Sequence, residues 1–167
     1  MGLQQVSSTT VTSSTASVTL TGIDSNDVYL FTWSGVTCSN DVQQNLIRIT
    51  KSGTPQTDAK YYTSSKLMYA SASFFNNATT TNTSMGALYQ GTGINESQNG
   101  LLYLHDFLSS DDYSYMTRES VSNSYVPQLQ SEHGGGVHAV ASASDGVQYF
   151  MAVGTLESGT FTLYRCL

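Results

Sequence analysis

The sequence predicts an all-β protein, an antiparallel β-sandwich of jelly-roll type that forms a single domain. Short runs of alternating apolar and polar residues are separated by clusters of Ser, Thr, Asn, Asp and Gly. No stretch places apolar residues at helical spacing. A length of 167 residues suits one domain with its own hydrophobic core.

The spacing of these runs narrows the architecture further. Strands that recur every 10 to 20 residues or so predict about eight to ten strands and favour a jelly roll over a meander barrel. A compact immunoglobulin-like sandwich is the alternative. The Cys and Trp spacing typical of true immunoglobulin domains is absent, which favours the jelly roll.

The first 15 residues predict an extended N-terminal arm that precedes a sandwich domain spanning residues 16–167. Leu3, Val6 and Val11 are the only sizeable apolar side chains in the arm, too few for a helix face. Such a segment gains order when a neighbouring subunit offers a groove or a sheet edge. Leu3 and Val6 are therefore candidate interface residues.

Four runs in the sandwich domain predict strands of different burial. Residues 18–21 form a short alternating strand, and residues 46–51 have one apolar and one polar face. Residues 28–33 and 101–107 are apolar or aromatic on both faces. The first of these two runs is predicted to be a strand that is central or covered on both sides, and the second a central strand.

The Tyr- and Ser-rich middle of the chain has weaker patterns. Residues 60–72 predict one or two strands with Tyr62, Leu67 and Tyr69 buried, and residues 73–83 predict an exposed loop. Residues 113–118 alternate, so this strand exposes either its tyrosines or Met116 beside Arg118.

The C-terminal third ends in the clearest alternation of the chain. Residues 134–136 are three glycines and predict a flexible turn, followed by a strand with an alanine-lined face over residues 137–143. The alternating runs 147–153 and 161–163 flank a turn-forming stretch at 154–159. They predict a β-hairpin with one buried face.

Composition and charge exclude several classes of function. Only 11% of the residues are charged, against about 25% in ordinary soluble domains, which suits extracellular or virion proteins better than cytosolic enzymes. The net charge is −6 and the six basic residues form no dense cluster, so a nucleic-acid partner is not expected. Residues 1–11 lack the basic start and apolar core typical of a secretory signal, and no apolar run is long enough to span a bilayer, so neither a secretory signal nor membrane association is expected.

No motif indicates an enzyme, a cofactor or a metal site. Adjacent Asp111 and Asp112 would point to opposite faces of an extended chain, a poor arrangement for a pair of glycosidase carboxylates. Glu132, His133 and His138 match no known spacing of metal ligands. The two cysteines, Cys38 and Cys166, are predicted to be structural free thiols.

Four runs of the chain carry a resemblance to a known group of proteins. They are GIDSNDVYLFTWSGV (22–36), LIRITKSGTPQTDAKYYTSS (46–65), NGLLYLHDF (99–107) and ESGTFTLYRC (157–166). In order and spacing they resemble small virion structural proteins of tailed phages, notably phages of marine and cyanobacterial hosts. The shared motifs are strand and turn signatures, so the resemblance carries over no functional residue.

The resemblance implies a jelly-roll-like subunit that is made in the host cytoplasm and resides on the capsid surface of the virion. The expected function is that of a capsid decoration (cement) protein, whose partners are the major capsid protein and further copies of itself, as a trimer. The alternative is a head or tail fibre or collar subunit that binds a host glycan.

Tyrosines are the side chains expected to make these contacts. Tyr113, Tyr115 and Tyr125, together with Tyr61, are available as exposed aromatic groups. Tyrosines among Ser and Gly suit either a wet protein interface or a glycan platform. Tyr113, Tyr115 and Tyr125 therefore join Leu3 and Val6 as the candidate interface residues.

Overall fold

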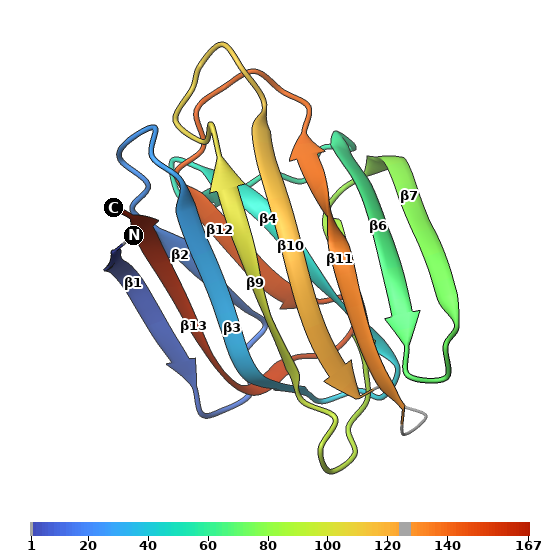
Figure 1. The fold of residues 1–167 in the computed structure, drawn as a ribbon. Coiled ribbons are helices and arrows are strands. Elements are labelled where there is room, and N and C mark those ends of the chain that lie inside the picture. Colours follow the sequence, from blue (N-terminus) through green and yellow to red (C-terminus); the bar gives the residue numbers. More distant parts are fainter. Residues whose placement is uncertain (1, 124–127) are drawn as a thin grey trace.

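The structure is a computed structural model that describes residues 2–123 and 128–167. It confirms the predicted all-β class: the described part of the chain contains thirteen strands and no helix, and hence no helix able to cross a membrane. The strands form two antiparallel sheets packed as a sandwich (Figure 1).

The larger sheet has eight strands and lies in front in Figure 1. In spatial order it contains β1 (Leu3–Val11), β13 (Leu156–Cys166), β3 (Tyr29–Cys38), β9 (Gln98–His105), β10 (Ser114–Asn123), β11 (Leu129–His138), β6 (Tyr61–Tyr69) and β7 (Phe74–Asn82). The five-stranded sheet contains β2 (Ser17–Thr21), β12 (Gly146–Met151) and β4 (Gln43–Lys51), with β5 (Thr54–Pro55) and β8 (Met85–Gln90) both paired to β4. This division into eight and five strands does not confirm the jelly-roll connectivity.

The core lies between the two sheets and is centred on packed aromatic rings. The ring of Trp33 lies 5.6 Å from that of Phe31 and 5.5 Å from that of Tyr149, and Tyr149 lies 5.1 Å from Phe161. All four side chains are fully buried. The predicted central strands are confirmed, since β3 lies between β13 and β9, and β9 lies between β3 and β10.

The predicted C-terminal hairpin is wrong, because its two strands belong to different sheets. β12 pairs with β2 and β4, whereas β13 pairs with β1 and β3. Residues 152–155 carry the chain from one sheet to the other, with Gly154 at a φ of 86°. Both strands turn one face to the same core, so their alternation is the same as that of two paired strands.

The predicted arm is not confirmed: residues 3–11 form β1, an edge strand on β13 of the same chain. The pairing runs from Leu3 opposite Cys166 to Val11 opposite Gly159, and a bridge joins Thr15 to Leu156. Backbone hydrogen bonds hold an edge strand in place, and this explains why so few apolar side chains suffice.

Two segments predicted to be irregular are strands. The expected loop at 73–83 contains β7, which is exposed on both faces and therefore shows no alternation. The glycines at 134–136 lie inside β11, which ends at His138, so residues 139–143 do not continue the predicted strand. A Cβ on Gly134 would overlap the backbone carbonyl of Ser64, so this glycine allows β6 to approach closely.

Both cysteines are free, as predicted. Cys38 is buried, and burial raises the pKa of its thiol to about 11. At pH 8 only about a thousandth of such a thiol is in the reactive thiolate form. We expect native Cys38 to resist a chromogenic disulfide reagent and the half-exposed Cys166 to react first, with both thiols reacting in denaturant. Equal rates for the two native thiols would contradict this burial.

Candidate interaction surface

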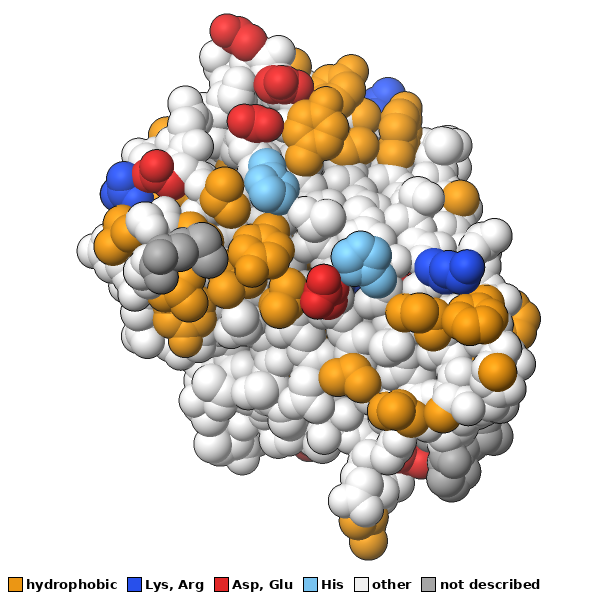
Figure 2. All heavy atoms as spheres, viewed as in Figure 1, with side chains coloured by type: hydrophobic (Ala, Val, Ile, Leu, Met, Phe, Trp, Pro, Cys, Tyr) orange, Lys and Arg blue, Asp and Glu red, His pale blue; other side chains and the backbone are white. Residues whose placement is uncertain are grey.

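The face of the eight-stranded sheet that points away from the five-stranded sheet is the candidate functional surface, here called the outer face. Its position follows from strand alternation: residues that alternate with the buried positions of β6, β9, β10 and β11 point outward. Figure 2 views this face and shows apolar side chains gathered in patches, with an acidic side chain and a histidine side by side near the middle. The outward residues used below are Tyr62, Ser64, Lys66 and Met68 of β6, Leu101 of β9, Tyr115, Thr117, Glu119 and Val121 of β10, and Ser131, His133, Gly135 and Val137 of β11.

Strand register aligns these residues in rows across the sheet. In one row Tyr115 of β10 lies opposite Val137 of β11, which in turn lies opposite Tyr62 of β6. Tyr62 is 40% exposed and Tyr115 is 42% exposed. The row is an aromatic and aliphatic band that solvent reaches from one side.

A second row carries charge. Glu119, His133 and Lys66 face one another on β10, β11 and β6. Nδ1 of His133 lies 3.4 Å from Oε1 of Glu119, and both side chains are more than half exposed. Solvent and salt screen such pairs, so this row affects specificity more than stability.

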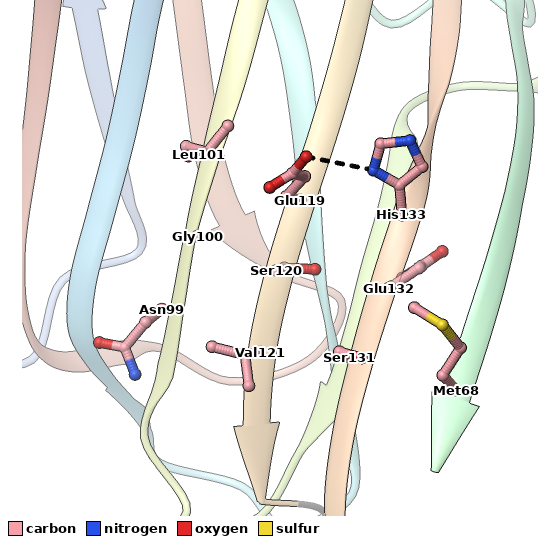
Figure 3. A pocket seen from close by; sticks show the side chains of 10 residues that line it. All are labelled: Met68, Asn99, Gly100, Leu101, Glu119, Ser120, Val121, Ser131, Glu132 and His133. Carbon is pink, nitrogen blue, oxygen red and sulfur yellow. Dashed lines mark ion pairs between the residues drawn. The ribbon is translucent and has the colours of Figure 1, made fainter. Parts of the chain in front are cut away.

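Two shallow hollows flank the charged row. The first, of about 430 Å³, has Met68, Leu101 and Val121 as its apolar lining and Asn99 and Ser131 among its polar lining (Figure 3). In Figure 3 the side chains of Glu119 and His133 stand along its edge, joined by their ion pair.

The second hollow, of about 450 Å³, contains the aromatic band of Tyr62, Val137 and Tyr115. Its base is Gly135, which lies between Thr117 of β10 and Ser64 of β6. A residue without a side chain at this position leaves the sheet surface recessed there. The outer face is thus recessed at two places, which side chains of a partner surface can fill.

The structure brings two of the predicted interface residues together. The rings of Tyr113 and Tyr115 lie 6.5 Å apart, and both side chains are exposed. The negative charge of Asp112 raises the pKa of Tyr115, so its hydroxyl stays protonated to a higher pH than that of an ordinary tyrosine. Tyr125 lies outside the described residues.

Leu3 and Val6 lie elsewhere on the same sheet. Both are on β1, separated from β10 by three strands, a distance of about 19 Å. Leu3 is half exposed, whereas Val6 approaches Gly22 of its own chain so closely that a Cβ there would lie 2.7 Å from its Cγ1. The structure therefore does not unite the predicted residues in one patch.

The two adjacent tyrosines of β6 lie on the faces opposite to those predicted. Tyr61 was expected to be exposed and is fully buried, with its hydroxyl donating to the Gln56 carbonyl at 3.0 Å. Tyr62 was expected to be buried and belongs to the outer face. A shift of one residue exchanges the two faces of a strand, and two consecutive tyrosines do not reveal which faces inward.

The residues considered for a metal site are divided between the two faces of the sheet. His133 is on the outer face, whereas Glu132 and His138 are buried on the inner face. Nε2 of His138 lies 2.8 Å from Oδ1 of Asp58. Burial raises the pKa of Asp58, but the hydrogen bond and charge of His138 outweigh it, and the net shift is downward. Within the described ranges, no three potential ligands converge on one point.

Comparison of the chain with protein-family models, with curated proteins and with solved structures finds no match.

Proposed function

We propose that this chain is a non-enzymatic virion structural protein, a capsid decoration protein that binds the outside of a phage head through the outer face. The observation that carries the proposal is the band of Tyr62, Val137 and Tyr115, which lines the second hollow, together with the first hollow on the same face. Exposed tyrosines bordered by polar and small residues are typical of wet protein interfaces. The resemblance of the four sequence runs to phage virion proteins supports the setting.

The outer face is large enough for a specific interface. Eight strands span about 34 Å across the sheet, and eight residues along a strand span about 27 Å. The product, about 900 Å², is close to the area that one partner buries in a standard interface. In area, one face of this sheet therefore matches one side of a standard protein interface.

Unprotected sheet edges support the proposed partners, the major capsid protein and further copies of this chain. β1 and β7 are the two edge strands of the larger sheet, each nine residues long and without a charged side chain. Long edges without Lys or Pro readily accept another strand. Oligomers on a capsid, a trimer in this proposal, would cover such edges.

A decoration protein stabilises the shell because its binding is linked to the equilibrium between closed and opened shells. A protein that binds only the assembled shell shifts the equilibrium away from shell opening. This role needs a repeated interface and no reacting group, and the exposed band and hollows of the outer face suit it.

Copy number on intact particles tests the proposal. We expect as many copies per virion as there are capsid-protein subunits or a simple fraction of that number, measured by quantitative mass spectrometry against the major capsid protein. A dozen copies or fewer would reject decoration and favour the fibre or collar alternative.

We further expect Tyr115→Ser to weaken binding to undecorated capsids about 30-fold, because a central aromatic contact is worth about 2 kcal/mol. The matched control is Tyr89→Ser. Tyr89 is exposed to a similar degree but belongs to β8, away from the outer face. Equal losses in the two variants, in a sedimentation assay of capsid binding, would refute the outer face as the binding surface.

A further inference from the structure

The unequal sizes of the two sheets leave part of the inner face of the larger one uncovered. β6 and β7 form one end of the eight-stranded sheet, and the five-stranded sheet ends at β8 and β5 (Figure 1). On β7, Phe75 and Asn77 pair with Leu67 and Ser65 of β6, whose side chains belong to the inner face. Phe75 is nevertheless 55% exposed. These inward positions face a groove where the core would otherwise continue.

The groove lies between the inner face of β6 and β7 and the strands β4 and β8. It consists of two adjoining hollows of about 240 Å³ each, which share Gln44, Asn77, Tyr89 and Glu132. These four side chains come from four different strands: β4, β7, β8 and β11. Their convergence is a product of the fold and not of any local sequence motif.

Glu132 is a buried carboxylate that lines both hollows of the groove. Its side chain is only 4% exposed, and Oε1 receives both Arg118 Nη2, at 2.5 Å, and the Ser65 hydroxyl, at 2.5 Å. Arg118 neutralises the charge of Glu132, so the groove offers a rigid acceptor without net charge.

The remaining lining specifies the chemistry of the ligand. Amides and hydroxyls supply paired donors and acceptors, from Asn77, Asn82, Thr63 and Thr79 among others. Aromatic rings occupy one end, where Tyr69 and Phe75 meet edge to face at a centroid distance of 5.7 Å. No described lining residue adds a charge to that of Glu132.

We propose that this groove binds a neutral oligosaccharide. Sugar hydroxyls match the amides, hydroxyls and carboxylate, and the apolar face of a pyranose ring packs against an aromatic side chain. The lining of the groove carries no net charge and does not suit phosphate-bearing or strongly anionic ligands, because the buried ion pair leaves no unpaired cation to hold them. Together the hollows have the volume of an ordinary small-ligand site, enough for two or three sugar units.

The inference does not rest on capsid decoration. The groove and the outer face are on opposite sides of the larger sheet, so a variant in one leaves the other intact. Failure of the copy-number test would leave the groove proposal standing, and absence of sugar binding would leave the decoration proposal standing.

The test is a titration of the ¹⁵N-labelled protein with maltotriose, cellotriose and N-acetyllactosamine, and with the anionic 3′-sialyllactose for comparison. We expect at least one neutral saccharide to shift amide resonances of β6, β7 and β8 saturably. No saturable shift with any of the three at up to about 10 mM, which would detect a millimolar Kd, overturns the proposal. Saturable shifts confined to the outer face also overturn it.

Two pairs of substitutions on β7 provide matched controls. Phe75→Ser and Asn77→Ala remove groove contacts and are expected to weaken binding about tenfold each. Phe74→Ser and Asn76→Ala alter exposed neighbours that point to the outer face, and are expected to leave the Kd unchanged. Equal weakening by Phe75→Ser and Phe74→Ser, or by Asn77→Ala and Asn76→Ala, overturns the proposal. Dimerisation in sedimentation that Phe75→Ser abolishes also overturns it, because a second copy would then occupy the groove.

Discussion

Glu132→Gln is expected to lower the free energy of unfolding by about 3 to 5 kcal/mol, the typical cost of removing one partner of a buried ion pair. Arg118 is 3% exposed and its guanidinium also donates to the backbone carbonyl of Gly86, so it cannot turn toward solvent without breaking that contact. Without the carboxylate, a positive charge would remain buried with no counter-charge. Urea unfolding followed by circular dichroism measures the effect.

Two further variants separate the charge effect from packing. The double variant Arg118→Met/Glu132→Leu removes both charges and keeps the volume, and is expected to be near neutral or stabilising. Glu119→Gln breaks the exposed pair with His133 and is expected to change stability by less than about 0.5 kcal/mol. A double variant as unstable as Glu132→Gln would show that the polar network, and not the unpaired charge, determines stability here.

Trp33→Ala is expected to cost about 3 to 5 kcal/mol, because it empties the centre of the core. The Trp33 ring contacts Phe31 and Tyr149 and is 1% exposed. Its indole nitrogen has no hydrogen-bond partner in the described part of the chain, so the loss is one of packing alone. Phe74→Ala is the control, since Phe74 is 59% exposed and is expected to change stability little.

The fit between Trp33 and its neighbour on β9 gives the same prediction a second test. Gly100 lies opposite Trp33 in the sheet, and a Cβ there would overlap the indole ring. Gly100→Ala should cost about 1 to 3 kcal/mol in the native chain and less in the Trp33→Ala background. Additive effects in this double-mutant cycle, measured by urea unfolding, would mean that the ring does not limit the space at Gly100.

The all-β class and the central strands were predictable because the signals are local. β3 and β9 carry apolar side chains on both faces, and such strands are typical of the middle of a sheet rather than its edge. The alternating runs that became β4 and β10 likewise specify one buried face each. Alternation depends only on the two-residue repeat of a strand, so no knowledge of its neighbours is required.

Pairing was not predictable to the same degree. The runs that became β12 and β13 look like a hairpin, yet they lie in different sheets. Strands of either sheet of a sandwich turn one apolar face to the shared core, so alternation does not reveal to which sheet a strand belongs. β7 shows no alternation because both of its faces are exposed. The glycines of β11 resemble a turn, although close approach of β6 is what requires Gly134.

The sequence by itself determined the fold class, the most deeply buried strands and the low-charge, tyrosine-rich surface. Only the tertiary structure decided which tyrosines share a face, and that Glu132 and Arg118 form a buried pair beneath a groove. The reason is physical: local periodicity encodes which side of a strand is apolar, whereas a site is formed by strands distant in sequence. The groove exists because eight strands face five, and that difference is a property of strand pairing as a whole.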